Sequence, residues 1–161
     1  MNNPSICDLI QHSSLTGDLS QVQCEDLSSI ATTRSLDDKE VLIEQGQLDE
    51  TLYIVSSGGL AVERNTAGGD IATLHILKPG DLAGEMGFVD GTEHTATLRA
   101  MGPTSVVSIG RDSFESLLSS KPEVVYGLMC GIVRKAHRIL REMNQQSMEL
   151  SNYITKVHGR Y

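Results

Sequence analysis

The residues best suited to chemistry in this sequence lie between Gly80 and Ala100. Gly84 stands directly before Glu85, at the start of a short turn-like run. Glycine allows backbone N–H groups to approach a ligand without an intervening side chain, and successive N–H groups at the opening of a helical turn attract anions. A carboxylate beside them can accept hydrogen bonds from hydroxyl groups. This combination suits a ribose phosphate, although Gly-Glu followed by a strand is by itself a weak motif.

A longer pattern surrounds this pair. Gly80-Asp81-x-x-Gly84-Glu85-Met86-Gly87-Phe88, followed by Thr95-Ala96-Thr97-Leu98-Arg99-Ala100, resembles the phosphate-binding cassette of the cyclic nucleotide-binding domain family. That family includes the bacterial catabolite activator and the regulatory subunits of cyclic-AMP-dependent kinase. The likeness covers roughly residues 20 to 145, and its further motifs are Ile43 with Gln45-Gly46, Leu52 to Gly58, and Phe114 to Pro122.

The resemblance implies a ligand site and a role for each cassette residue. Glu85 would accept hydrogen bonds from the ribose 2′-hydroxyl, and N–H groups from Gly84 to Met86, with Thr95, would hold the phosphate. The implied ligand-binding residues are Ala83, Gly84, Glu85, Met86, His94 and Thr95. The implied ligand is a cyclic nucleotide, either cyclic AMP or cyclic GMP, or a related signalling nucleotide such as a cyclic dinucleotide.

Two positions depart from the family's pattern. The family normally carries an arginine where this sequence has His94, and often a large apolar residue where it has Ala83. Losing an arginine–phosphate contact costs about 1.5–3 kcal/mol, or roughly 10- to 150-fold in affinity. A micromolar site would therefore be weakened without necessarily being emptied.

Composition limits the class of protein. Of the 161 residues, 21 are acidic and 13 are Lys or Arg, a formal charge of −8, which argues against nucleic-acid binding because such binding draws on phosphate neutralisation by basic residues. No run approaches the roughly 20 apolar residues of a membrane helix, and Met1-Asn2-Asn3-Pro4 does not resemble a signal peptide. The three scattered cysteines indicate reduced thiols and a cytoplasmic protein.

The order of elements predicts a mainly β fold with flanking helices. Ser20 and Gln23 can form a capping box, and an apolar helical face follows them up to Ala31. Gly58-Gly59 and Gly68-Gly69 stand between alternating runs, as in hairpins. Strands are expected at 41–44, 51–55, 60–64, 71–77, 95–100 and 105–109. Such strands indicate a sandwich, jelly roll or barrel, and the resemblance narrows this to an antiparallel β-roll, also called a double-stranded β-helix.

The chain returns to helix after Gly110. Asp112 and Glu115 have the spacing of an N-terminal cap, and a break at 119–121 precedes Pro122, which suits a first helical turn. The expected organisation is a lead-in over 1–19 with at most one short helix, a β-roll with helices over 20–120, and a long C-terminal helix over 121–158.

Apolar residues repeat along the long helix with the spacing of a coiled coil. One set recurs every seven residues and the other lies four residues before it, as a and d positions do. The sets are Met129, Ala136, Met143, Leu150 and Val157, and Val125, Ile132, Ile139, Gln146 and Tyr153. A helix of about 35 residues reaches roughly 50 Å and should project beyond a small domain, so we expect a parallel homodimer. The alternative is one amphipathic helix on its own roll, with Leu128, Val133 and Leu140 widening its apolar face.

No pattern of an enzyme or a metal site is evident. The five histidines are dispersed and lack the spacing of metal ligands, which also argues against a metal-dependent cupin. The basic residues between Arg134 and Arg141 indicate a solvated helix face. The family's transcriptional members carry a helix-turn-helix after the long helix, and only 151–161 follow Leu150, so we expect no direct DNA binding. Gly127 and Gly131 fit either close packing or a hinge.

Two functions of different classes remain open. One is a regulatory, ligand-sensing module that binds a nucleotide in the roll and relays it through the dimer helix to an unidentified downstream protein. The other is a dimeric protein-interaction module whose degenerate pocket no longer binds nucleotide. Base choice in this family usually involves the long helix, where Ile139 and Leu140 offer no hydrogen bond.

Overall fold

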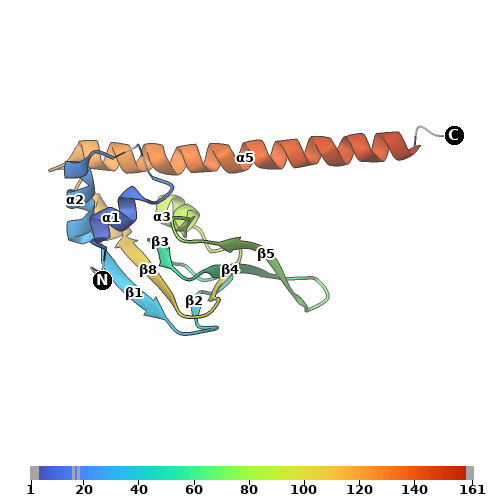
Figure 1. Ribbon diagram of the computed structural model, residues 1–161, viewed down its shortest axis with the longest axis horizontal. Coiled ribbons are helices and arrows are strands. Elements are labelled where there is room, and N and C mark those ends of the chain that lie inside the picture. The colour runs from blue at the N-terminus through green and yellow to red at the C-terminus, as the bar shows by residue number, and fades with distance from the viewer. Residues whose placement is uncertain (1–3, 16, 18, 159–161) are drawn as a thin grey trace.

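The computed structural model describes residues 4–15, 17 and 19–158 (Figure 1). The helices are α1 (Ile6–Gln11), α2 (Gln21–Ile30), α3 (Glu85–Asp90), α4 (Arg111–Glu115) and α5 (Pro122–His158). The strands are β1 (Thr32–Leu36), β2 (Val41–Ile43), β3 (Thr51–Ser57), β4 (Leu60–Asn65), β5 (Ile71–Leu77), β6 (Leu82–Ala83), β7 (Thr97–Ala100) and β8 (Thr104–Gly110).

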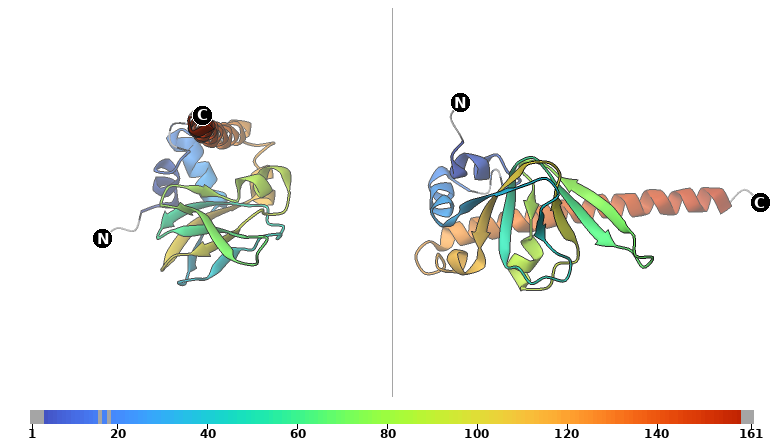
Figure 2. Two further views of the ribbon diagram at one scale, coloured as in Figure 1. Left: turned by 90° about the vertical axis from the view of Figure 1, so that its right-hand side faces the viewer. Right: turned by 90° about the horizontal axis from the view of Figure 1, so that it is seen from below.

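The strands form two antiparallel sheets of four strands each. One sheet has the order β1-β8-β3-β6 and the other β2-β7-β4-β5. In the first sheet Leu52 pairs with Ile109 and Ile54 with Val107; in the second, Val62 pairs with Leu98. The two sheets face one another in a roll, with helices beyond the first sheet (Figures 1 and 2). The predicted antiparallel β-roll with a long C-terminal helix is confirmed.

The two faces of strand β3 enter two different cores. Side chains alternate between the faces of a strand, so Leu52 and Ile54 join a core beneath the helices, while Tyr53 and Val55 join a core between the sheets. The helix-side core also receives Cys7 and other side chains from α1, α2, α3 and α5. Strand β3 is apolar on both faces because both faces are buried.

Several local signals in the sequence act as expected and one does not. Ser20 and Gln23 form the predicted capping box at the start of α2, and α5 begins at Pro122. The predicted cap at Asp112 is wrong: α4 begins at Arg111 after Gly110, with no side-chain cap. Arg111 instead pairs with Glu115 at 2.8 Å, which uses the acidic group that the pattern assigned to a cap.

The turn at Gly58-Gly59 is not a hairpin. Strands β3 and β4, on either side of it, belong to different sheets, so the chain crosses between sheets there. Gly58 has φ +75°, and a Cβ would lie 2.5 Å from the Pro103 carbonyl oxygen. The loop containing Gly68-Gly69 does connect a hairpin, that of β4 and β5. The sequence prediction also missed β1 and the two-residue β6.

Helix α5 has a buried beginning and an exposed remainder. Val124, Leu128 and Ile132 are buried against the roll, and from Ala136 to Ile154 every side chain is exposed. The helix continues well past the roll in the direction of the β4–β5 hairpin (Figures 1 and 2). Within the described part of the chain, no helix has the length and apolar character needed to cross a membrane.

The exposed apolar stripe of α5 differs from the predicted seam by one residue. Ile132 is 6% exposed and Val125 packs against the same core, so these two side chains are used within the chain. Val133 and Leu140, which the alternative of a helix lying on its own roll would bury, are 48% and 54% exposed. The stripe therefore combines one predicted set, whose first member Met129 is itself partly packed on that core, with the residues that follow the other set: Tyr126, Met129, Val133, Ala136, Leu140, Met143, Ser147, Leu150 and Ile154.

Candidate ligand-binding site

A cavity of about 630 Å³ lies between the roll and α5. Its walls come from β4, β5, β6, α3, residues 92–98 and one face of α5. All six residues assigned to the ligand site from the sequence line it: Ala83, Gly84, Glu85, Met86, His94 and Thr95. Ala83 is buried, whereas Met86 and Thr95 are exposed at the cavity surface. The structure thus brings the predicted set together, and their role in binding stays a prediction.

Gly84 holds the start of the cassette in a conformation that suits glycine. Its φ is +76°, in the left-handed region. A Cβ there would lie 2.5 Å from the Thr51 carbonyl oxygen and 3.3 Å from the Tyr53 ring. Any side chain would therefore clash with the backbone of β3. This close contact fixes where α3 begins and where Glu85 projects.

Glu85 is oriented by a lysine from α5. The Lys135 ammonium lies 3.0 Å from Glu85 Oε1 and donates to the Leu82 carbonyl oxygen at 2.5 Å. Both side chains are largely buried, with 12% of Lys135 and 24% of Glu85 exposed. In the described part of the chain Oε2 has no partner, so it is free to accept from a ligand hydroxyl. The ion pair also joins α5 directly to the cassette.

His94 points back toward the roll. Its Nε2 lies 2.9 Å from the Asp49 carbonyl oxygen, and because a carbonyl only accepts, Nε2 must carry the proton. Gly87 makes room for this contact, since a Cβ there would lie 2.6 Å from the same oxygen and 3.0 Å from Nε2. Among the described residues Nδ1 has no partner. A neutral His94 therefore offers a phosphate no donor, and only a protonated ring does.

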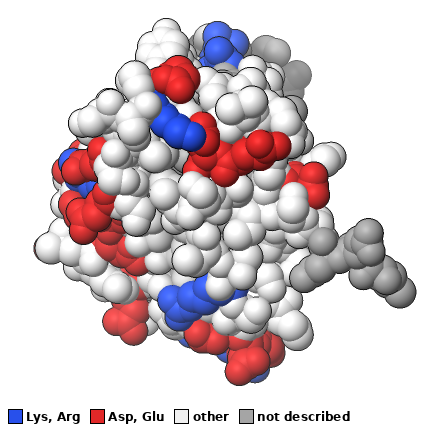
Figure 3. Space-filling view, turned by 90° about the vertical axis from the view of Figure 1, so that its left-hand side faces the viewer, with Lys and Arg blue, Asp and Glu red and all other residues white. Residues whose placement is uncertain are grey.

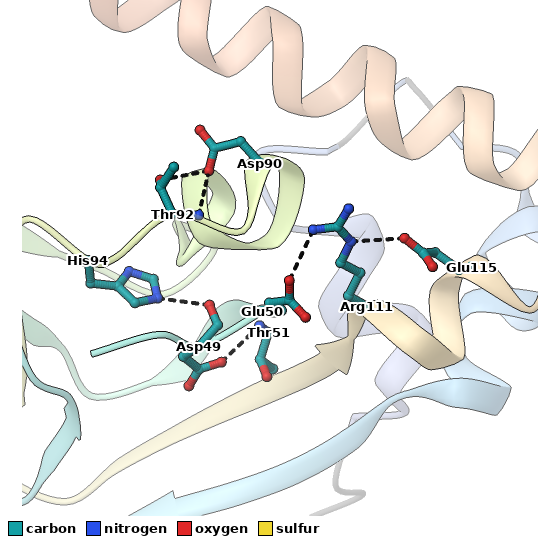
Figure 4. A network of polar contacts seen from close by, with 8 residues as sticks. All are labelled: Asp49, Glu50, Thr51, Asp90, Thr92, His94, Arg111 and Glu115. Carbon is teal, nitrogen blue, oxygen red and sulfur yellow. Dashed lines mark hydrogen bonds and ion pairs between the residues drawn. The ribbon is translucent and has the colours of Figure 1, made fainter. Parts of the chain in front are cut away.

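The loop before β3 is fixed by further contacts (Figure 4). Asp49 Oδ1 accepts from the Thr51 amide at 2.8 Å and Oδ2 from the Tyr53 hydroxyl at 2.8 Å. Burial, together with the hydrogen bond to Asp49, raises the pKa of Tyr53 to about 12. The phenol therefore remains a donor throughout the physiological range, and the carbonyl that holds His94 has a fixed position.

The segment that leads from α3 to His94 is held in the same way. Asp90 accepts from the hydroxyl and the amide of Thr92 at 2.7 and 3.0 Å, and these bonds hold the pKa of Asp90 below its ordinary value. Nearby, Arg111 bridges Glu50 at 3.2 Å and Glu115 at 2.8 Å (Figure 4). The Asp90–Thr92 bonds thus fix this segment internally, and the Arg111 bridge joins α4 to the loop before β3.

Besides the six assigned residues, the cavity lining includes side chains that the sequence reasoning missed, among them three on α5 and Ser14. Lys135, Arg138 and Glu142 line the cavity beside Ile139, with the spacing i, i+3, i+4, i+7 of one helix face. That spacing could have identified them. Leu140, by contrast, belongs to the outer stripe. Ser14 also lines the cavity, and its hydroxyl is buried with no hydrogen-bond partner among the described residues; nothing in its sequence context points to the site.

The remaining chemistry of the described residues is limited. They contain no group of three or more His, Cys, Asp or Glu side chains placed to hold a metal ion. Cys7, Cys24 and Cys130 are free thiols, and burial is the main cause that raises the pKa of Cys24 to about 12. The end of the molecule where α5 begins carries scattered acidic side chains and isolated basic ones (Figure 3).

Comparison with known proteins decides the family. The profile described as "Cyclic nucleotide-binding domain" matches residues 33–121, more than half of the chain. The chain belongs to the cyclic nucleotide-binding domain family. The match includes the whole cassette and the His94–Asp49 contact, whereas Lys135, the partner of Glu85, lies on α5 beyond the matched range.

Two curated relatives of this cyclic nucleotide-binding domain are named for cyclic AMP. The cyclic AMP receptor protein of Thermus thermophilus is 32% identical over 105 residues, which are 65% of this chain and 49% of the relative. A cAMP-activated global transcriptional regulator of Escherichia coli O6:H1 is 34% identical over 98 residues, 60% and 47% of the two chains. This chain thus spans about half the length of the curated relatives it matches.

A solved structure extends the likeness of fold to most of the chain. A cyclic nucleotide-binding domain from Methylobacillus flagellatus has a TM-score of 0.79 at 21% identity and covers 90% of this chain and 82% of its own. The shared fold therefore extends well beyond the residues of the profile match.

Proposed function

We propose that this chain is a regulatory, ligand-sensing module that binds a cyclic nucleotide in the cavity between its β-roll and α5. The observation that carries the proposal is that all six cassette residues line one cavity, whose far wall is the helix that leaves the domain. A volume of about 630 Å³ falls in the range of about 300–1,000 Å³ typical of small-molecule sites. Cyclic AMP and cyclic GMP are the candidate ligands, the first supported by the names of the relatives.

Each part of such a ligand has a partner of suitable chemistry. Glu85 Oε2 accepts from the ribose 2′-hydroxyl, while Lys135 holds Oε1. The N–H groups of Gly84 to Met86 and the Thr95 hydroxyl bind phosphate oxygens, with Ala83 leaving room beside them. A protonated His94 contributes Nδ1–H. The module binds and relays, and no group in the cavity has an arrangement that suggests catalysis.

The signal leaves the domain through α5. Lys135 couples the cassette to this helix at 3.0 Å, so a ligand that draws Glu85 toward itself changes the contact between roll and helix. Gly127 and Gly131 are both buried where α5 meets the roll, which favours close packing there over a hinge. Beyond Ala136 the helix is exposed and free to engage a partner.

That partner is a second copy of the chain. The outer stripe of α5, from Tyr126 to Ile154, keeps alternating spacings of three and four residues, the pattern of a parallel coiled coil. Leu140, Met143 and Leu150 are each more than half exposed in the single chain, and a dimer buries them. A downstream protein would then be contacted by the dimer. An intracellular nucleotide as ligand and three free thiols fit a cytoplasmic location.

A dimeric interaction module without a ligand is the second candidate. The observation that favours it is His94, which takes the arginine's position and donates to Asp49 rather than into the cavity. Under this alternative the fold and dimer are kept while nucleotide affinity is lost.

Calorimetric titration of the purified 161-residue chain with cyclic AMP, cyclic GMP and cyclic dinucleotides separates the two candidates. Saturable binding of one of them, abolished by Glu85→Ala, supports the sensor. Lack of binding by both the native chain and His94→Arg at millimolar ligand rejects the sensor and leaves the interaction module.

A further inference from the structure

The cassette itself has no strong cation for a phosphate. A cyclic phosphodiester carries one negative charge, and burying such a charge is costly unless it is paired. Between Gly80 and Ala100 the only basic side chains are His94 and Arg99. Arg99 donates to Glu63 at 3.0 Å and to the Lys39 carbonyl oxygen at 3.1 Å, and it does not line the cavity. The countercharge must therefore come from outside the cassette.

Helix α5 brings two cations to the cavity wall, Lys135 and Arg138. Lys135 is already neutralised by Glu85 and fixed by the Leu82 carbonyl oxygen. Its contact with the cassette shows that α5 runs within side-chain reach of the phosphate-binding segment. Arg138 lies about one turn farther along the same face of the helix.

Arg138 is exposed at the cavity surface, and among the described residues it forms no hydrogen bond or ion pair. Its guanidinium keeps its charge at all working pH values and presents a planar set of donors that matches two phosphate oxygens. Lys78 is the other cation of the lining, but a lysine offers a compact charge without that fork. Arg138 is therefore the group best suited to the task.

We infer that Arg138 supplies the countercharge for the ligand's phosphate, in place of the arginine that His94 has replaced. The inference rests on the proposed function and identifies the ligand as a cyclic mononucleotide whose phosphate is held from two sides. The N–H groups of the cassette contact it from the roll, and Arg138 contacts it from α5. Binding thereby links the roll to the helix through the ligand itself, in addition to the Lys135–Glu85 pair.

The test compares Arg138→Gln with Arg141→Gln in the complete 161-residue chain. Arg141 lies on the same helix, outside the cavity lining, and is the matched control for net charge. Calorimetric titration with cyclic AMP and cyclic GMP at constant salt should show Arg138→Gln weakening binding about 10- to 150-fold, the usual loss of a charge-assisted contact. Arg141→Gln should bind as the native chain does. Thermal unfolding of each variant checks that the fold is retained.

The decisive measurement repeats the pair in the His94→Arg background. Restoring the cassette arginine provides a second countercharge, so Arg138→Gln should then cost much less than it does in the native background. Equal losses in both backgrounds mean that Arg138 acts elsewhere on the ligand, and they overturn the inference. So does a loss confined to Lys78→Gln.

The remaining outcomes separate this inference from the proposed function. If the native chain binds and Arg138→Gln matches Arg141→Gln, the inference fails while the sensor stands. If only His94→Arg binds, the site is intact but Arg138 does not replace the arginine, and the inference fails again. If neither binds any cyclic mononucleotide, the proposed function and the inference fail together.

Discussion

His94 shows how the chemistry of a site depends on the orientation of one side chain. Its Nε2 is committed to the Asp49 carbonyl oxygen at 2.9 Å, so any interaction with a ligand falls to Nδ1. The substitution could be recognised from the cassette pattern, but its orientation could not. That orientation depends on Gly87 and Asp49, which are 38 residues apart in the sequence and meet only in the folded chain.

Restoring the family's arginine predicts a gain in affinity. His94→Arg replaces a ring whose Nε2 donates to the Asp49 carbonyl oxygen with a guanidinium whose planar set of donors matches two phosphate oxygens. His94→Arg should therefore bind a cyclic nucleotide about 10- to 150-fold more tightly than the native chain. Calorimetric titrations of both proteins in the same buffer and salt check this, and equal affinities contradict it.

Gly84 predicts a loss of stability on substitution, because it combines a left-handed backbone with a close contact to β3. Gly84→Ala places a Cβ 2.5 Å from the Thr51 carbonyl oxygen at φ +76°, and a left-handed backbone alone costs a non-glycine residue about 1–2 kcal/mol. We expect the free energy of unfolding to fall by about 2 kcal/mol or more. Gly68→Ala is the matched control, because a Cβ there meets nothing closer than 3.8 Å. Urea unfolding of the two variants measures the difference; equal midpoints would show that the clash is relieved cheaply.

At the scale of elements, the sequence predicts most strands of the roll. It does not predict features that depend on how the strands pack and pair. The six expected strands all form, because alternation and glycine turns mark them locally. Strand β1 was missed because four of its five side chains are exposed, which leaves no apolar pattern to detect. Gly58-Gly59 looks the same in sequence whether the chain turns back or crosses to the other sheet, and pairing with β8 determines that it crosses.

The same limit applies to α5, where Ile132 and Ile139 stand seven residues apart. Their seven-residue spacing predicted that both face a partner helix. In the structure, Ile132 is 6% exposed in the core and Ile139 is 40% exposed beside the cavity. Ile132→Ala should lower the free energy of unfolding by about 2–5 kcal/mol. Ile139→Ala should change it by less than about 1 kcal/mol, since little apolar area is lost. Urea unfolding at one fixed protein concentration checks both values, and similar losses would place Ile139 in a buried contact that the single chain does not have.

For the whole molecule, the exposed length of α5 is the feature that a single chain does not explain. A helix of 37 residues spans roughly 55 Å, and its side chains from Ala136 to Ile154 are all exposed. The sequence repeat predicts a partner for such a helix, but it does not predict the register of the seam. The roll uses Val125 and Ile132 for itself, so the seam left for a partner is shifted by one residue.

Because the seam is shifted, the effect of a substitution on the dimer should depend on whether its residue lies on the outer stripe. Leu140 and Leu150 lie on the outer stripe and are 54% and 62% exposed, so replacing both with aspartate should place charges in the seam and yield monomers. Met148→Asp is the matched control, because Met148 is 64% exposed but lies off the stripe and should leave the dimer intact. Light scattering after gel filtration at tens of micromolar protein should give twice 17.5 kDa for the native chain and the control, and the single-chain mass for the double variant.

Circular dichroism should show the roll still folded in the monomer, since neither leucine belongs to its core. A native mass of one chain, or dissociation by Met148→Asp but not by the leucine pair, contradicts the seam.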